Sequence, residues 1–158
     1  MGTLPDDRVL RLVRLRNGDL VTANIQVGSR LAAVTISIGK MLLPSLDDAE
    51  LERCLSERPF AGAAGPNAIG PLDELRDALA GIRRRGWVAQ GEELAYGLRS
   101  VAAPVTDAVG MAAPARGLPV ERLVAELCPV LQSACGEVSR LHGGRRGAGQ
   151  TSVRPPST

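Results

Sequence analysis

A single segment, residues 86–105, constrains the fold of this chain more than any other. It reads GWVAQGEELAYGLRSVAAPV, so a charged, glycine-containing loop (GEELAYG) leads into the apolar run VAAPV. The run has no stripe at helical spacing and is therefore typical of a buried strand. The segment predicts a loop that places polar groups at the mouth of a sheet.

The composition is that of one globular domain. At 158 residues, with 44% hydrophobic and 23% charged residues, the chain can bury a sizeable core. Aromatic residues make up only 2%, so the core must be built from Leu, Val, Ile and Ala. A net charge of +2 is too small to indicate nucleic-acid binding by itself. Because the N-terminus lacks signal-peptide features and no apolar run is long enough to span a membrane, we expect a cytoplasmic protein.

The cysteines and the histidine do not form a metal site in the sequence. Cys54, Cys128 and Cys135 show no CxxC spacing, and His142 is the only histidine. Zinc sites need about four such ligands, so no metal and no cofactor is expected. Cys128 and Cys135 lie seven residues apart in a helical pattern, too far for a disulfide. We therefore expect three buried free thiols.

A β-hairpin is predicted near the N-terminus. Residues 9–16 and 20–27 are rich in Val, Leu and Ile, and Asn17-Gly18 between them supplies the positive φ values of a tight turn. The second strand is expected to end at residues 27–30.

Four segments carry helical signals. A short helix is expected from Ile38, and the capping signature Ser45-Leu46-Asp47-Asp48 opens a second that ends before Pro59. Pro71 is expected as the first residue of a third helix, which Gly86 ends. The longest is predicted over residues 120–141, kinked at Pro129. The expected buried side chains are Leu51, Cys54 and Leu55 on the second helix, Leu72, Leu75, Leu79 and Ile82 on the third, and Leu123, Leu127, Val130, Leu131, Ala134 and Val138 on the last.

Two features allow more than one interpretation. Arg83, Arg84 and Arg85 form either a solvated helix end that complements the helix dipole or a phosphate-binding patch; no aromatic or further basic run supports the patch. Trp87 and Tyr96 are expected to pack against the protein, with ligand stacking as the alternative.

Three stretches together resemble the C-terminal effector-binding domain of IclR-type transcriptional regulators. Residues 86–105 fit the pattern G-[YW]-x-x-x-x-E-E-x-x-x-G-[LV]-x-x-[VI]-A-x-P-[VI]. Residues 27–33, VGSRLAA, are similar to the family's VGSRLPA, and residues 37–43, SIGKMLL, to its S-x-G-[KR]-x-L-L. The L-x-P-x-L of residues 127–131 is similar to the family's C-terminal helix, and the nearest subfamily is that of the aromatic-acid pathway regulators.

The resemblance implies an α/β (α+β) sensor domain of the GAF/PAS kind, in which helices flank an antiparallel sheet. Its effector would be a small organic or aromatic acid. The start of a helix offers backbone N–H groups to a carboxylate, here at Ser37, Ile38 and Gly39. The implied effector site comprises Ile36, Ser37, Ile38, Gly39, Gln90, Glu92, Glu93 and Ser100.

Departures from the family pattern lead us to expect an incomplete domain. Nothing before Val9 resembles a winged helix, and the match is expected to begin within the family's sensor domain. Gln90 and Gly91 stand where the family often has an Asp before the acidic pair. After residues 107–110 the family continues into a full strand, whereas Pro114 predicts that this strand is missing here. The expected organisation is a flexible 1–7, a partial effector-binding domain over 8–142 and a disordered 143–158.

Three functions from different classes remain open. The first is an effector-sensing domain without its own DNA-binding domain, with weak or no acid binding because of the missing strand. The second is an interaction protein that forms hetero-oligomers with full-length regulators, or homo-oligomers. The third is an enzyme using Glu92 and Glu93, which we do not favour because adjacent residues of an extended segment point to opposite faces. We expect no catalytic residues, no nucleic-acid binding and no membrane partner.

Overall fold

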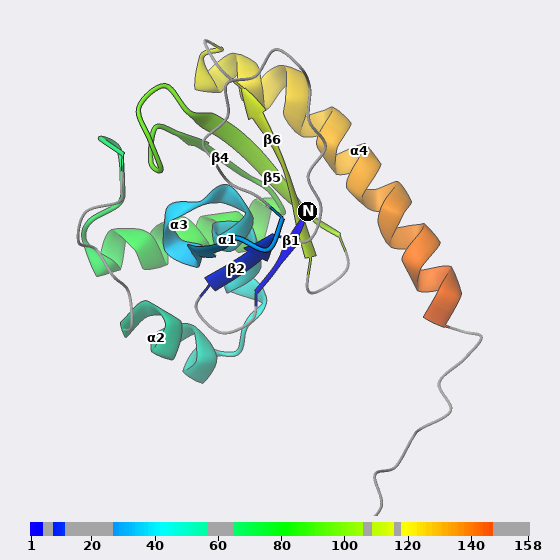
Figure 1. Ribbon diagram of the computed structural model, residues 1–158, viewed down its shortest axis with the longest axis horizontal. Helices are drawn as coiled ribbons and strands as arrows, with labels where there is room; N and C mark the ends of the chain where they lie inside the picture. The colour runs from blue at the N-terminus through cyan, green and yellow to red at the C-terminus, as the bar shows by residue number, and fades with distance from the viewer. Residues whose placement is uncertain (5–7, 12–26, 57–64, 106–108, 116–117, 147–158) are drawn as a thin grey trace, which may run out of the picture.

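A six-stranded antiparallel sheet forms the centre of the molecule in the computed structural model (Figure 1). The structure describes residues 1–4, 8–11, 27–56, 65–105, 109–115 and 118–146. The strand order is β3-β2-β1-β6-β5-β4. The strands are β1 (Gly2–Thr3), β2 (Arg8–Arg11), β3 (Arg30–Ala32), β4 (Val88–Gly91), β5 (Arg99–Val105) and β6 (Val109–Ala115).

Successive side chains of β5 pack against different helices on the two faces of the sheet. Ala102 joins the apolar cluster that contains residues of helix α1 (Ser37–Leu42). Its neighbours Val101 and Ala103 join a second cluster with helix α4 (Val120–Arg146). Because successive strand residues point to opposite faces, α1 and α4 cover opposite sides of β5. Both faces of this strand are therefore buried, which explains its unbroken apolar run.

The connecting helices wrap the α1 side of the sheet. Short 3-10 turns, η1 (Ala33–Thr35) and η2 (Leu43–Ser45), precede and follow α1. Helix α2 (Asp48–Ser56) starts after Asp47, whose Oδ1 accepts the N–H of Glu50 at 2.8 Å. The predicted segment does open the helix, but Asp47 is the capping residue. The Ser45 hydroxyl, which the signature placed at the cap, instead donates to the Leu42 carbonyl at 2.6 Å. Cys54 and Leu55 are buried as expected, and Leu51 is partly buried.

Helix α3 (Leu72–Arg85) follows its sequence signals closely. Its apolar stripe is buried, and Gly86 ends it in the left-handed conformation with φ 72°. The first helical residue is Leu72 rather than Pro71, which precedes the helix in an extended conformation. Arg83 is not simply a solvated helix end, because its guanidinium donates to the Pro44 carbonyl and so ties α3 to η2.

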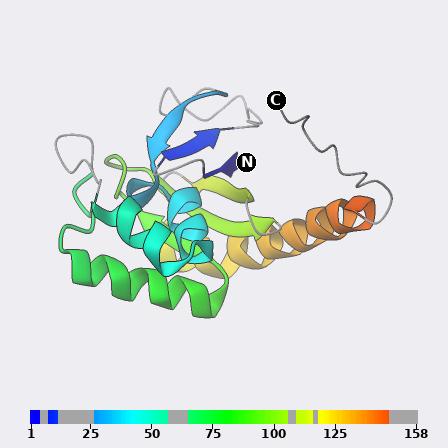
Figure 2. The ribbon, with the colours of Figure 1, turned by 90° about the horizontal axis from the view of Figure 1, so that it is seen from below.

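Helix α4 is longer than predicted and runs to Arg146 (Figure 2). The helix continues through Pro129, and Figure 2 shows its second half extending beyond the sheet. Its buried residues are Leu123, Cys128, Leu131 and Cys135. The predicted burial of Val130 is wrong, since its side chain is 65% exposed.

The prediction that a sheet strand is missing after residue 110 is also wrong. Strand β6 pairs with β5 along its whole length, from Val105↔Val109 to Arg99↔Ala115. Pro114 lies opposite Ser100, and β1 pairs with β6 only at Val109 and Gly110. At Pro114, the edge of β6 that faces away from β5 is thus not paired with β1. A proline is tolerated on such an unpaired edge because its missing N–H would have no strand to bond there.

Part of the predicted N-terminal hairpin lies outside the described residues. Only β2 of its first strand is described, and it pairs antiparallel with β3. Residues 20–26 of its second strand also lie outside the described residues, and Val27-Gly28 is a turn at the place where that strand was expected to end, before β3 begins at Arg30. The described part of the chain holds no helix long and apolar enough to cross a membrane.

Candidate functional site

The polar residues of β4 and β5 meet on the face of the sheet covered by α1. Gln90 lies directly opposite Ser100, two residues along each strand from the pair Val88 and Ala102. Val88 and Ala102 both belong to the apolar cluster on the α1 side. Gln90 and Ser100 therefore share that face, because side chains repeat their direction every second residue.

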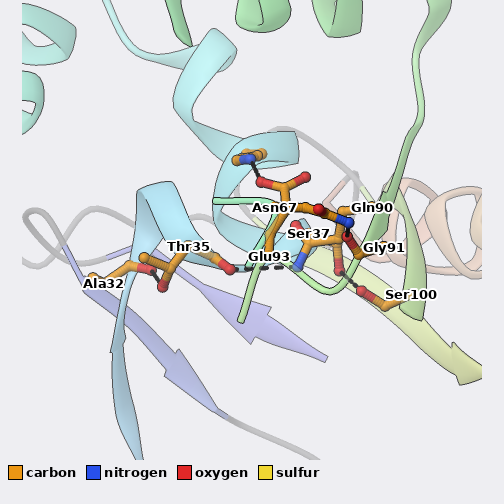
Figure 3. A network of polar contacts seen from close by, with 9 residues as sticks. Ala32, Thr35, Ser37, Asn67, Gln90, Gly91, Glu93 and Ser100 are labelled. Atoms are coloured by element: carbon orange, nitrogen blue, oxygen red, sulfur yellow. Dashed lines mark hydrogen bonds and ion pairs between the residues drawn. The ribbon is translucent and has the colours of Figure 1, made fainter. Parts of the chain in front are cut away.

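Ser37, the first residue of α1, joins this pair from the helix above the sheet. The Ser100 hydroxyl donates to the Ser37 hydroxyl at 2.9 Å, and Ser37 is only 3% exposed. Figure 3 shows Ser37, Gln90 and Ser100 beside one another under the start of the helix. The structure thus brings together three of the predicted site residues from segments more than fifty positions apart.

The first backbone N–H groups of α1 have no acceptor within the helix. Ile36 precedes the helix in an extended conformation and provides no side-chain cap. The first intrahelical bond of α1 is donated by the N–H of Lys40 to the Ile36 carbonyl at 3.0 Å. A helix has no internal acceptor for its first N–H groups, here those of Ser37, Ile38 and Gly39. The side chains of Ile36 and Ile38, by contrast, belong to the apolar core. These two residues can therefore offer polar groups to a ligand only through their backbone.

Gly39 lets α1 approach the preceding turn very closely. A Cβ atom at this position would lie 2.1 Å from the Ala33 carbonyl oxygen. No side chain fits there without moving the helix. The packing of α1 against the preceding turn therefore requires glycine at position 39. Its predicted role, to donate a backbone N–H to a ligand, is compatible with this packing.

Gln90 is held at one end of its amide only. Its Nε2 donates to the Thr35 carbonyl at 3.3 Å (Figure 3). Its Oε1 is the one buried side-chain polar atom without a hydrogen-bond partner among the described residues. Gln90 is 5% exposed, so water does not reach the amide freely.

Lys40 is a functional-site neighbour that sequence reasoning missed. Its ammonium forms an ion pair with the Glu93 carboxylate, and the two side chains are 2% and 13% exposed. Burial lowers the pKa of Lys40 from its ordinary value of 10.5 to about 8. The available signal was its place directly after Ser37-Ile38-Gly39, as the only lysine of the chain.

The two predicted acidic residues have different partners. Glu92 adopts a left-handed conformation with φ 61° and pairs with Arg99 at 3.0 Å, whereas Glu93 pairs with Lys40. The segment is thus a bend rather than the extended chain we expected, and neither carboxylate is freely solvated. Both fix the loop after β4 to its surroundings.

A second loop supports this bend from outside. The Gly65 N–H donates to the Glu93 carbonyl at 2.6 Å, and the Asn67 amide donates to the Gly91 carbonyl at 3.1 Å (Figure 3). The segment before α3 therefore braces the loop that carries Glu92 and Glu93. Three segments contribute to the polar site: the start of α1, the ends of β4 and β5, and residues 65–67.

The buried ammonium makes stability depend on pH above about 8. The pKa of Lys40 is about 8 in the folded chain and 10.5 ordinarily, so the unfolded chain binds more protons between these values. The free energy of unfolding should then rise with pH across this window, by at most about 3.5 kcal/mol at about 1.4 kcal/mol per pKa unit. Lys40→Arg is the control, because a guanidinium does not titrate there. Urea unfolding at about pH 7.5 and about pH 10 should show a gain for the wild type relative to this variant. A constant difference between the two proteins would contradict the assignment.

The other residues that the sequence analysis singled out lie outside the site. Cys54, Cys128 and Cys135 are buried thiols, as expected, and burial raises the pKa of Cys128 and Cys135. Trp87 packs against the α4 cluster, with the Arg85 guanidinium 5.1 Å from its ring centre. Tyr96 is 85% exposed, so the prediction that it packs against the protein is wrong.

Taken together, the fold and the site define an α+β domain whose antiparallel sheet meets a short helix at a cluster of hydrogen-bonding groups. The family model for the C-terminal domain of the bacterial transcriptional regulator IclR matches residues 1–143. This chain belongs to the IclR family of transcriptional regulators, which it matches through that C-terminal domain.

Similar regulators are longer than this chain. The Pca regulon regulatory protein of Pseudomonas putida is 32% identical over 111 residues, which cover 70% of this chain and 38% of the relative. The regulator BhcR of Paracoccus denitrificans is 33% identical over 113 residues, covering 72% and 40%. The chain thus spans about two-fifths of the length of these curated relatives.

Solved structures confirm the predicted α+β fold. A transcriptional regulator of Rhodococcus sp. RHA1 aligns with a TM-score of 0.78 at 29% identity, covering 88% of this chain and 58% of that one. An IclR homologue of Microbacterium hydrocarbonoxydans in complex with 4-hydroxybenzoate aligns with 0.76 at 26% identity, covering 88% and 57%. IclR of Thermotoga maritima aligns with 0.81 at 21% identity, covering 90% and 60%, and shares the fold.

Proposed function

We propose that this chain is an effector-binding domain that takes a small organic or aromatic acid where α1 meets β4 and β5. The observation that carries the proposal is the hydroxyl pair of Ser37 and Ser100, 2.9 Å apart, beside the start of α1. Hydroxyl groups and the first N–H groups of a helix are the donors that a carboxylate needs. The Microbacterium relative in complex with 4-hydroxybenzoate supports this ligand class.

The site residues divide into two groups under this proposal. Ser37, Ile38 and Gly39 would bind the carboxylate through backbone N–H groups, with Ser100 and Gln90 facing them from the sheet. Glu92 and Glu93 would instead hold the surrounding loop, because each already has a cation partner and a carboxylate repels an anionic ligand. Ile36 would set the helix start through its extended backbone.

The reason for expecting weak binding no longer applies. That expectation depended on a missing strand beside β5, and β6 occupies the position with full pairing. A complete sheet provides a rigid floor on which Ser100 is fixed. The proposal therefore includes micromolar binding of the acid.

Isothermal titration with benzoate and 4-hydroxybenzoate tests this function. Wild-type protein should bind at least one acid with a micromolar Kd. Ser100→Ala should weaken binding about 10-fold, because one hydrogen bond to a charged group is lost. Ser56→Ala, which alters an exposed serine at the end of α2, is the matched control and should bind like wild type. Absence of heat with either acid at millimolar concentration, or equal affinity of Ser100→Ala and wild type, would contradict the proposal.

A further inference from the structure

The amide of Gln90 has a fixed orientation. A backbone carbonyl only accepts hydrogen bonds, so the group that faces the Thr35 carbonyl at 3.3 Å must be the amide nitrogen. The amide oxygen consequently points away from Thr35. It is buried, and no donor among the described residues reaches it.

A buried acceptor of this kind favours a bound group that can donate a hydrogen bond to it. Leaving a buried carbonyl unpaired is unfavourable, and native proteins rarely do so without a functional reason. Gln90 lies directly across from Ser100, which already engages Ser37. The unpaired oxygen is thus a neighbour of the hydroxyl pair to which the acid is assigned.

The chemistry of the acceptor selects the donor. A neutral amide oxygen compensates the desolvation of an ammonium group less well than a carboxylate does, whereas it pairs well with a hydroxyl. A ligand with a carboxylate for the start of α1 and a hydroxyl for Gln90 would satisfy both parts of the site.

We propose that Gln90 is a specificity-determining residue that selects hydroxylated acids over the same acids without a hydroxyl. The inference rests on the proposed function, since it assigns the ligand class of that same site. Gln90 accepts the hydroxyl proton of the ligand at Oε1 while its Nε2 remains bonded to Thr35. An acid lacking the hydroxyl leaves that oxygen buried and unpaired in the complex.

Paired titrations test the selectivity. Wild-type protein is titrated with 3-hydroxybenzoate and 4-hydroxybenzoate against benzoate, and with lactate against propionate. At least one hydroxylated acid should bind about 10-fold more tightly than its partner, the usual effect of one hydrogen bond in a buried site. Gln90→Met has a similar length without the amide, and it should reduce this ratio to about one. Gln132→Met alters an exposed glutamine of α4 and should leave the ratio unchanged.

The outcomes separate this inference from the function on which it rests. Binding of the acids with equal affinity in wild-type protein, or a ratio that survives in Gln90→Met, overturns the selectivity and leaves acid binding intact. No binding of any acid overturns both. Equal affinities in wild-type protein overturn the selectivity even where Gln90→Met does not fold.

Discussion

At about pH 7, where Lys40 is charged, replacing it by methionine should lower the free energy of unfolding by about 3 kcal/mol, because a mostly buried carboxylate then loses both its cation and the N–H donors that even a neutral lysine would keep. Lys40 and Glu93 are 2% and 13% exposed, and they join α1 to the loop after β4 across 53 positions of sequence. Equilibrium unfolding in urea measures the loss. The double variant Lys40→Met/Glu93→Leu should recover most of it, since a well-packed apolar pair can replace a buried ion pair at little cost.

The exposed ion pair between Arg76 and Glu52 provides the control for this experiment. Its atoms are 2.8 Å apart, yet the side chains are 40% and 54% exposed. Arg76→Gln should therefore change stability much less than Lys40→Met, because solvent screens exposed pairs. A double variant no more stable than Lys40→Met would show that the pair is not the source of the effect.

Replacing Gly39 by alanine should destabilise the domain by about 3 kcal/mol, at the upper end of the cost of overpacking. In a helix this substitution ordinarily adds about 1 kcal/mol of stability. Here the new methyl group would lie 2.1 Å from the Ala33 carbonyl oxygen, which is backbone and cannot move aside alone. The start of α1 should shift, so acid binding should be lost together with stability.

Gly136→Ala is the matched control for this prediction. Gly136 also lies in a helix, α4, but it is exposed and nothing stands within 4 Å of the position of its Cβ. This variant should be as stable as wild type or gain up to about 1 kcal/mol. If Gly39→Ala melts like Gly136→Ala, the close approach of α1 to η1 does not exist in solution.

The local parts of the fold could be predicted from sequence because their signals are local. The end of α3 at Gly86, the cap near Asp47 and the apolar stripe of α3 each depend on residues a few positions apart. The apolar run after the GEELAYG loop likewise predicted β5. The family resemblance added the sheet and the site residues, of which Ser37, Gln90 and Ser100 do lie together.

The missed features depend on contacts between distant segments. We predicted no strand at β6 because a proline such as Pro114 would interrupt a strand that is paired on both sides. The register shows that β1 does not pair with β6 at Pro114, so β6 is paired on one side only at that position. The bond between Lys40 and Glu93 has no signature in either segment alone. Val130 follows the helical period but lies on the side of α4 that the sheet does not cover, as its 65% exposure shows.

Chemical-shift mapping of the backbone amides tests the central claim most directly, and the chain of 16.5 kDa is small enough for it. Titration with 4-hydroxybenzoate should produce the largest changes at Ser37, Ile38 and Gly39, with further changes at Gln90 and Ser100. A binding site at the start of α1 over β4 and β5 predicts this pattern. Changes that centre on another surface, or no changes at millimolar ligand, would contradict the account.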